Sequence, residues 1–109
     1  MHFDITDIHY RIKQEIVQAL FQVVDPELGI NIIDLGLVYG IAVEDTDKTV
    51  RIDMTLSTPS CPLGGLIKSH VTLAAETAAP GFTVVVNLVW EPRWNAERIS
   101  GQGHALLGW

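Results

Sequence analysis

Cysteine is almost missing from this sequence: Cys61 is the only one among 109 residues. A single thiol excludes an internal disulfide, and the chain also lacks the paired Cys and His spacing of a zinc site. The absence of disulfides fits the reducing cytoplasm, where we expect the protein to be located. No glycine-rich phosphate loop and no Ser-His-Asp signature is present either.

Basic residues are scarce as well. Seven Lys and Arg oppose 13 Asp and Glu, which gives a formal charge of −6. Because affinity for nucleic acid comes largely from basic side chains on phosphates, this balance argues against a nucleic-acid partner. The N-terminus lacks the basic and apolar regions of a signal peptide, and no apolar run is long enough to span a membrane, so we expect no membrane association.

What the sequence has in quantity is apolar residues, 48% of the chain, which are enough for the core of a single domain over 1–109. Apolar residues at helical spacing predict helices over 7–24 and 62–79, with Thr6 or Asp7 as the first N-cap. We expect the first helix to end near Asp25, because Pro26 follows. In the tail 101–109, Gly101 and Gly103 weaken any helix.

Strands are predicted over 37–44, 49–56 and 83–90. In the first, alternation places Leu37, Tyr39, Ile41 and Val43 on one face. The short polar turn between the first two strands predicts an antiparallel hairpin, and the following strand–helix–strand unit predicts a parallel third strand. That third strand is apolar on nearly both faces, which predicts a central place or one under a partner. The predicted fold is α+β, in the order αββαβ: a three-stranded mixed sheet with two helices on one face.

Cys61 lies at the predicted start of the second helix, because the Pro62 that follows is typical of a first helical position. The helix dipole there favours the thiolate. A lone cysteine is most often a small buried hydrophobe, but a position between prolines and close to Gly64 and Gly65 favours a functional thiol. His70 is on the same helix and points elsewhere, so no catalytic base is predicted beside the sulfur.

Two further groups have alternative interpretations. Asp25, Glu27 and Asp34 fall within one short loop, where they cap turns or, alternatively, line a site for a metal or a partner's cation. Trp90 and Trp94 stand on either side of Pro92. They either cover the open side of the core or anchor a partner.

Four separated motifs resemble the metal–sulfur cluster biosynthesis family, which includes the SufT and PaaD proteins. They are Asp25-Pro26-Glu27, the run 31–39, the run from Thr55 through Cys61-Pro62, and the run 90–94. The resemblance implies an αββαβ domain with an accessory role in maturing iron–sulfur proteins. It implies that Cys61 is the reactive or ligating residue, with Asp25, Glu27 and Thr55 around it. PaaD-type chains carry an additional cysteine-bearing tail, so the stand-alone SufT-like branch is the expected one.

On this basis we expect an adaptor or carrier for iron–sulfur cluster assembly rather than an enzyme, in which Cys61 transiently binds iron or a cluster. Since clusters commonly take four thiolates, other ligands must come from a partner, a second subunit, a small thiol or carboxylates. The expected partners are iron–sulfur assembly proteins and apo client proteins, and a homodimer would bring two Cys61 side chains together. The alternatives are a metal-free module that docks clients and a Cys61 thiol enzyme.

Overall fold

The computed structural model describes residues 6–58 and 64–108. The predicted order of two helices and three strands is confirmed, and a short C-terminal pair of helices is added. The elements are α1 (Tyr10–Leu20), β1 (Val38–Glu44), β2 (Thr49–Met54), α2 (Gly64–Ala78), β3 (Thr83–Leu88), the 3-10 helix η1 (Ala96–Arg98) and α3 (Gly101–Leu107). Among the described residues, no helix is both long and apolar enough to cross a membrane.

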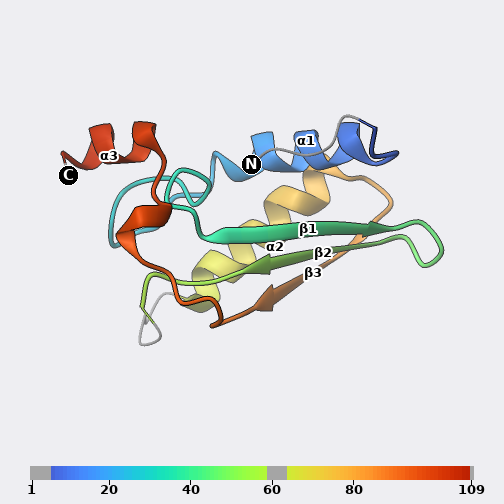
Figure 1. Ribbon diagram of the computed structural model, residues 1–109. Coiled ribbons are helices and arrows are strands. Elements are labelled where there is room, and N and C mark those ends of the chain that lie inside the picture. The colour runs from blue at the N-terminus through green and yellow to red at the C-terminus, as the bar shows by residue number, and fades with distance from the viewer. Residues whose placement is uncertain (1–5, 59–63, 109) are drawn as a thin grey trace.

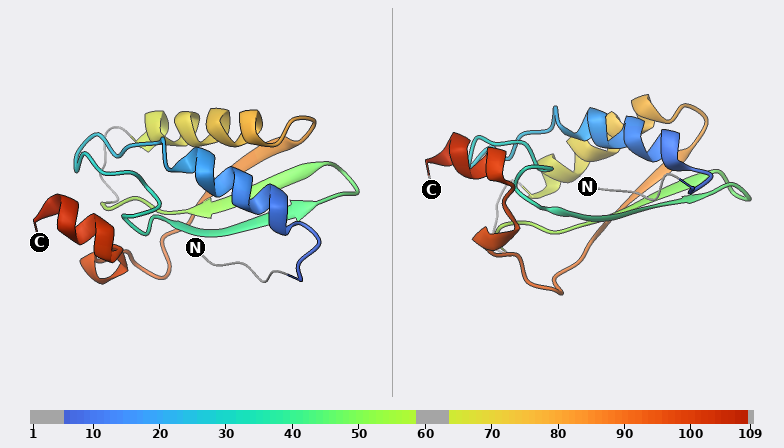
Figure 2. Two further views of the ribbon diagram at one scale, coloured as in Figure 1. Left: turned by 90° about the horizontal axis from the view of Figure 1, so that it is seen from above. Right: turned by 45° about the horizontal axis from the view of Figure 1, so that its top comes forward.

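The three strands form one mixed sheet in the order β1-β2-β3, with β1 antiparallel and β3 parallel to β2. Both α1 and α2 cover the same face of this sheet (Figures 1 and 2). The prediction of a central third strand is wrong, because β2 is central and β3 is at an edge. Only one face of β3 is buried, through Val84 and Val86, while Val85 on the other face is 47% exposed.

The core lies between the helices and the covered face of the sheet. It is built from residues at helical spacing in α1 and α2 and at alternating positions in β2, and the members with no or almost no exposed surface include Ile16, Leu20, Val50, Ile52, Met54, Ile67 and Val71. Each such side chain contributes about 1.5–3 kcal/mol by burial. The sequence periodicity located this core because both elements bury one face only.

Tyr39 does not share the buried face of β1 as predicted. The register shifts between Val38 and Gly40, so Tyr39 is the extra residue of a β-bulge. A bulge reverses the alternation of side chains, which is why Val38 is buried on the same strand as Ile41. Tyr39 instead donates a hydrogen bond from Oη to the carbonyl oxygen of Pro92, at 2.8 Å.

The first helix is shorter than predicted, since α1 ends at Leu20 rather than near Asp25. The chain beyond it bonds to a loop instead: the Ile32 amide donates to the Val23 carbonyl at 3.0 Å. The N-cap is His9, without a side-chain cap, rather than Thr6 or Asp7. Asp7 accepts a hydrogen bond from Lys13 Nζ at 2.7 Å, and this bond holds the pKa of Asp7 below its ordinary value.

The tail forms a helix despite its glycines. Ser100 is the N-cap of α3, and its Oγ accepts from the Gly103 amide at 2.9 Å. A Cβ on Gly103 would lie 2.6 Å from Ile99 Cγ2 and 3.0 Å from the Asp34 carbonyl oxygen. Gly103 therefore allows the helix to approach the loop that precedes β1, and the contact offsets its low helix propensity.

Gly36 lies against the C-terminal segment and leaves no room for a side chain there. Its φ is 74°, and a Cβ there would collide with the backbone carbonyl of Arg98. We expect Gly36→Ala to lower the free energy of unfolding by about 2 kcal/mol or more, from left-handed strain and the collision together. Urea denaturation measures this loss.

Gly29→Ala is the matched control, because Gly29 has a φ of 73° and no atom within 4 Å of the added Cβ. It carries the strain without the collision and should cost about 1 kcal/mol. Equal losses in the two variants would show that the Arg98 contact does not constrain residue 36.

Candidate functional site

Two of the motif segments meet at the end of the sheet where β2 and β3 finish. Thr55, Leu56 and Ser57 follow β2 directly, and the segment 89–94 follows β3. The Val89 amide donates to the Met54 carbonyl at 2.8 Å, which keeps the two segments together beyond the strands. The C-terminal segment with η1 lies at this same end (Figure 1).

A cavity of about 250 Å³ opens between these two segments. Its walls combine two indoles, one carboxylate, one guanidinium and one hydroxyl, from Leu56, Ser57, Trp90, Glu91, Arg93 and Trp94. Sequence analysis singled out the two tryptophans but missed Ser57 and Arg93. Arg93 was within the quoted 90–94 motif, so the signal was present.

The two tryptophans have different roles in this cavity. Trp94 packs against the core and donates from Nε1 to the Leu35 carbonyl at 2.7 Å. Trp90 is 43% exposed. Each interpretation offered for the pair therefore fits one of the two residues. Trp94 covers the core, and Trp90 leaves an aromatic surface exposed.

Thr55 is 1% exposed and is attached to the loop before β1. Its amide donates to the Leu37 carbonyl at 2.8 Å, and the Leu37 amide donates in turn to the Ile32 carbonyl at 3.1 Å. With the bond from Ile32 to Val23, a chain of backbone hydrogen bonds runs from the end of α1 to the end of β2. This chain fixes the residue that precedes Leu56 and Ser57 of the cavity wall.

Asp25 is also 1% exposed, and its carboxylate organises a turn. Oδ1 accepts from the amides of Glu27 at 2.8 Å and Leu28 at 3.2 Å, while the Asp25 backbone bonds to Ile30 and Gly29. These bonds fix the Asp25 side chain within its own turn. Glu27 lies on the exposed side of the same turn.

Asp34 fastens the C-terminal segment to the loop before β1. Its carboxylate accepts from Asn31 Nδ2 at 2.7 Å and from Ser100 Oγ at 2.8 Å. Its carbonyl accepts from the Ser100 amide at 2.7 Å. Of the loop carboxylates, Asp25 and Asp34 thus both make the local bonds expected of turn and cap residues.

Cys61 and Pro62 lie outside the described residues. The helix that follows them begins at Gly64, which is buried against Leu56: a Cβ on Gly64 would lie 2.8 Å from Leu56 Cδ1. Gly64 therefore serves packing between α2 and the cavity wall rather than approach by a ligand. Gly65 is exposed, with no atom within 4 Å of an added Cβ.

The cavity wall contains one guanidinium, that of Arg93. Arg93 makes no ion pair with any described residue, whereas Lys13, Arg11 and Arg51 pair with Asp7, Glu15 and Asp53 respectively. Within 6–58 and 64–108, no group of three or more His, Cys, Asp or Glu residues is arranged to hold a metal ion. The described residues alone therefore do not form a metal centre.

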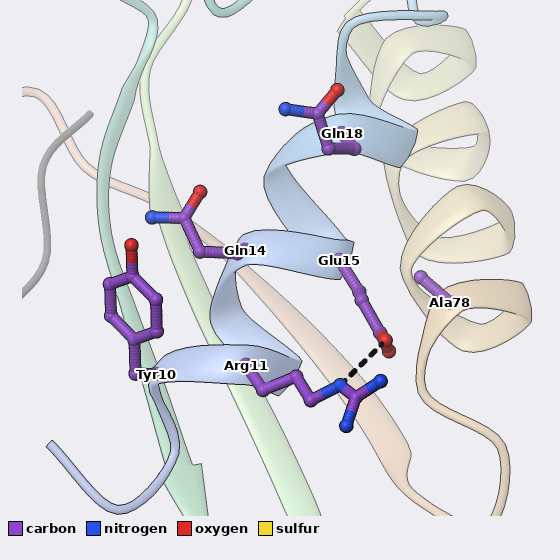
Figure 3. Close-up of a pocket in the computed structure, with 6 residues that line it drawn as sticks. All are labelled: Tyr10, Arg11, Gln14, Glu15, Gln18 and Ala78. Atoms are coloured by element: carbon purple, nitrogen blue, oxygen red, sulfur yellow. Dashed lines mark ion pairs between the residues drawn. The ribbon is translucent and has the colours of Figure 1, made fainter. Parts of the chain in front are cut away.

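Two other hollows share no lining residue with this cavity. A groove of about 780 Å³ between α1 and α2 is lined by Tyr10, Arg11, Gln14, Glu15, Gln18 and Ala78 (Figure 3). It presents the wet side of α1, with Arg11 and Glu15 paired at 3.7 Å, and contains none of the motif residues. The other, of about 400 Å³, lies where the Arg98 guanidinium stacks 4.8 Å from the centre of the Tyr39 ring.

Comparison with known proteins identifies the family. Residues 13–88, which are most of the chain, match the model of the iron–sulfur cluster assembly protein family. The chain belongs to the iron–sulfur cluster assembly protein family. The matched range includes Asp25, Glu27, Thr55 and Cys61 and stops before the Trp90–Trp94 segment.

Individual members of this family are similar over nearly their whole length. The Fe-S protein maturation auxiliary factor YitW of Bacillus subtilis is 39% identical over 89% of this chain and 94% of its own. The Fe-S protein maturation auxiliary factor SufT of Staphylococcus aureus is 42% identical over 79% and 97%. The crystal structure of a domain of unknown function, DUF59, from Bacillus anthracis superposes with a TM-score of 0.83 at 35% identity, covering 90% and 92%.

The anchoring of Trp94 is testable. We expect Trp94→Phe to lower the free energy of unfolding by about 1 kcal/mol or more, because the Leu35 carbonyl loses its donor. Trp90→Phe is the control and should change stability by less than about 0.5 kcal/mol, since Trp90 is exposed. Urea unfolding followed by circular dichroism measures both. A loss no larger in Trp94→Phe than in Trp90→Phe would contradict the anchor.

Proposed function

We propose that this member of the iron–sulfur cluster assembly protein family is a cytoplasmic accessory factor in the maturation of iron–sulfur proteins and not an enzyme. The observation that carries the proposal is the cavity beside Thr55–Ser57, at the end of the strand that leads into the Cys61 segment. Its indoles, guanidinium and hydroxyl are binding groups. No histidine is among the residues that line this cavity.

In this proposal, Cys61 binds iron or a cluster transiently, and the cluster is cargo that is passed on. A thiolate is a good ligand for iron, and one thiolate leaves most positions of a cluster unfilled. The other ligands then come from an assembly protein, an apo client, a small thiol or a second copy of the chain. Incomplete ligation suits a carrier, because the receiving protein can supply the missing thiolates.

Asp25 and Thr55 would shape this site from beneath rather than ligate. Both are buried, and Asp25 Oδ1 already accepts two backbone hydrogen bonds. Glu27 is the exposed carboxylate of the turn, and it is the acidic residue that we propose to face the cargo or partner. Arg93 supplies a positive charge, which is suited to the anionic character of thiolate-ligated clusters.

A second candidate function is a docking module that delivers clients without touching metal. The exposure of Trp90 beside Arg93 favours it, because exposed Trp and Arg are the residues that most often dominate binding surfaces. The two candidates share one surface and differ in whether the thiol is required.

Anaerobic reconstitution with iron and sulfide tests the carrier. We expect the wild-type protein to bind iron and develop visible absorbance, and Cys61→Ser to lose most of both, because the thiolate is the ligand. Ser57→Ala is the control, since it alters the cavity wall but keeps the thiol. If Cys61→Ser matches the wild type in iron content and absorbance, iron binding through Cys61 is wrong.

Capture of an apo iron–sulfur client by the purified protein tests docking separately. We expect Trp90→Ala to weaken capture on the order of tenfold or more, as truncation of a central aromatic does. Trp94→Phe, which keeps an aromatic ring and leaves Trp90 in place, is the comparison. Undiminished capture by Trp90→Ala would remove this surface as the docking site.

A further inference from the structure

The cavity of about 400 Å³ beside Tyr39 combines one guanidinium with largely apolar walls. It is lined by Gly36, Val38, Tyr39, Pro92 and Arg98, and we call it the Arg98 recess. Its volume lies within the usual range of ligand pockets, about 300–1,000 Å³. Arg98 is the one charged residue among those that line it, so the recess is suited to an anionic group.

The Arg98 guanidinium is positioned by an aromatic ring. Its Cζ lies 4.8 Å from the centre of the Tyr39 ring. The ring is itself fixed, because Tyr39 Oη donates a hydrogen bond to the Pro92 carbonyl oxygen at 2.8 Å. A guanidinium stacked on an aromatic face keeps the N–H donors along its edge available for a carboxylate.

The backbone of Arg98 is constrained as well. Its amide donates to the Asn95 carbonyl at 3.1 Å, within the turn of η1. Its own carbonyl lies against Gly36, where an added Cβ would collide with it. Since both the backbone and the side chain of Arg98 are positioned by the fold, a ligand that binds there has little left to order.

No acidic group in the described part of the chain pairs with this guanidinium. The Arg98 side chain makes neither an ion pair nor a hydrogen bond with a described residue, whereas Arg51 pairs with Asp53 at 3.4 Å. Glu97, the preceding residue, is exposed and forms no ion pair with Arg98. Arg98 is exposed too, so a carboxylate from another molecule can reach it.

The recess adjoins the cavity beside Trp90. Pro92 lines the recess, and its neighbours Glu91 and Arg93 line the other cavity. A partner bound at the exposed Trp90 can therefore extend across the segment 90–94 to Arg98. Because the chain carries a net charge of −6, an acidic residue of a partner is attracted mainly where a cation stands unpaired.

We propose that the Arg98 recess binds the side-chain carboxylate of an Asp or Glu residue on a partner protein. Arg98 donates two hydrogen bonds from the edge of its guanidinium to the carboxylate. Tyr39 positions that guanidinium, and Val38 and Pro92 contact the aliphatic part of the acidic side chain. The contact is independent of the proposed function, because its loss would leave iron binding through Cys61 unchanged.

Nuclear magnetic resonance of the arginine Nε–H groups tests the recess. The probe is the blocked tripeptide acetyl-Gly-Glu-Gly-amide, which carries one side-chain carboxylate and no terminal one. We expect a saturable shift of the Arg98 Nε–H signal, with a dissociation constant on the order of 10 mM, because a single charge-assisted pair forms. Arg11 and Arg51, which already pair with carboxylates, are internal references and should shift far less.

The neutral peptide acetyl-Gly-Gln-Gly-amide is the matched control, because it has the same shape without the charge. It should leave the Arg98 signal in place. Tyr39→Leu removes the stacking face and should weaken binding of the Glu peptide about threefold or more. Tyr39→Phe keeps the ring and should bind it within about twofold of the wild type.

Three results would overturn the proposal. They are the absence of a saturable shift at Arg98, equal shifts with the Glu and Gln peptides, and equal shifts at Arg98 and Arg51. A folded Tyr39→Leu protein that binds the Glu peptide as tightly as the wild type would refute the role of Tyr39. The peptide comparison uses the wild-type protein, so it decides the question even if Tyr39→Leu does not fold.

Discussion

The hydrogen bond from the Thr55 amide to the Leu37 carbonyl is the connection on which the site depends. At 2.8 Å it joins the end of β2 to the loop before β1, and that loop is bonded in turn to the end of α1 and to the C-terminal segment. Segments far apart in sequence therefore meet on one short stretch of backbone. Because each bond is buried or half-buried, breaking one costs more than an exposed bond would.

The loop 31–37 contacts several other segments at once. Leu35 accepts from Trp94, Asp34 accepts from Ser100, and Gly36 leaves room for the backbone of Arg98. Removing any one of these contacts would loosen the cavity wall before it affected the core of the sheet. The cavity wall is thus held in place by contacts within the fold.

Much of this architecture was predictable from sequence, and the exceptions have physical reasons. Helices and strands with one buried face show a periodic pattern of apolar residues, so the αββαβ order was predicted. The short turn and the strand–helix–strand unit then predicted the strand directions. Tyr39 was misplaced because it is itself the extra residue of a β-bulge, which interrupts the alternation there, and no local pattern marks it. α1 was predicted too long because Val23 and Val24 continue an apolar stripe while their backbone bonds to the loop.

For the cavity, the sequence motifs indicated the two segments that line it but not the contacts that their residues make. Asp25 and Thr55 were chosen on resemblance, and both are buried: Asp25 bonds within its own turn, and Thr55 bonds to the loop before β1. Ser57 and Arg93 lay within the quoted runs 55–62 and 90–94, but neither was singled out, because the sequence does not show that these two segments line one cavity. The prediction for Cys61 concerns a residue outside the described range and stays a prediction.

Amide hydrogen exchange at Thr55, Leu37 and Ile32 is the most direct measurement of the account's central claim, that a backbone ladder fixes the site to the core. The account predicts that these amides exchange nearly as slowly as those of Ile52 in the central strand, through opening of the whole domain. Exchange at the rate of exposed loop amides would contradict it, because the bonds between the end of β2 and the loop before β1 would then open without unfolding of the sheet.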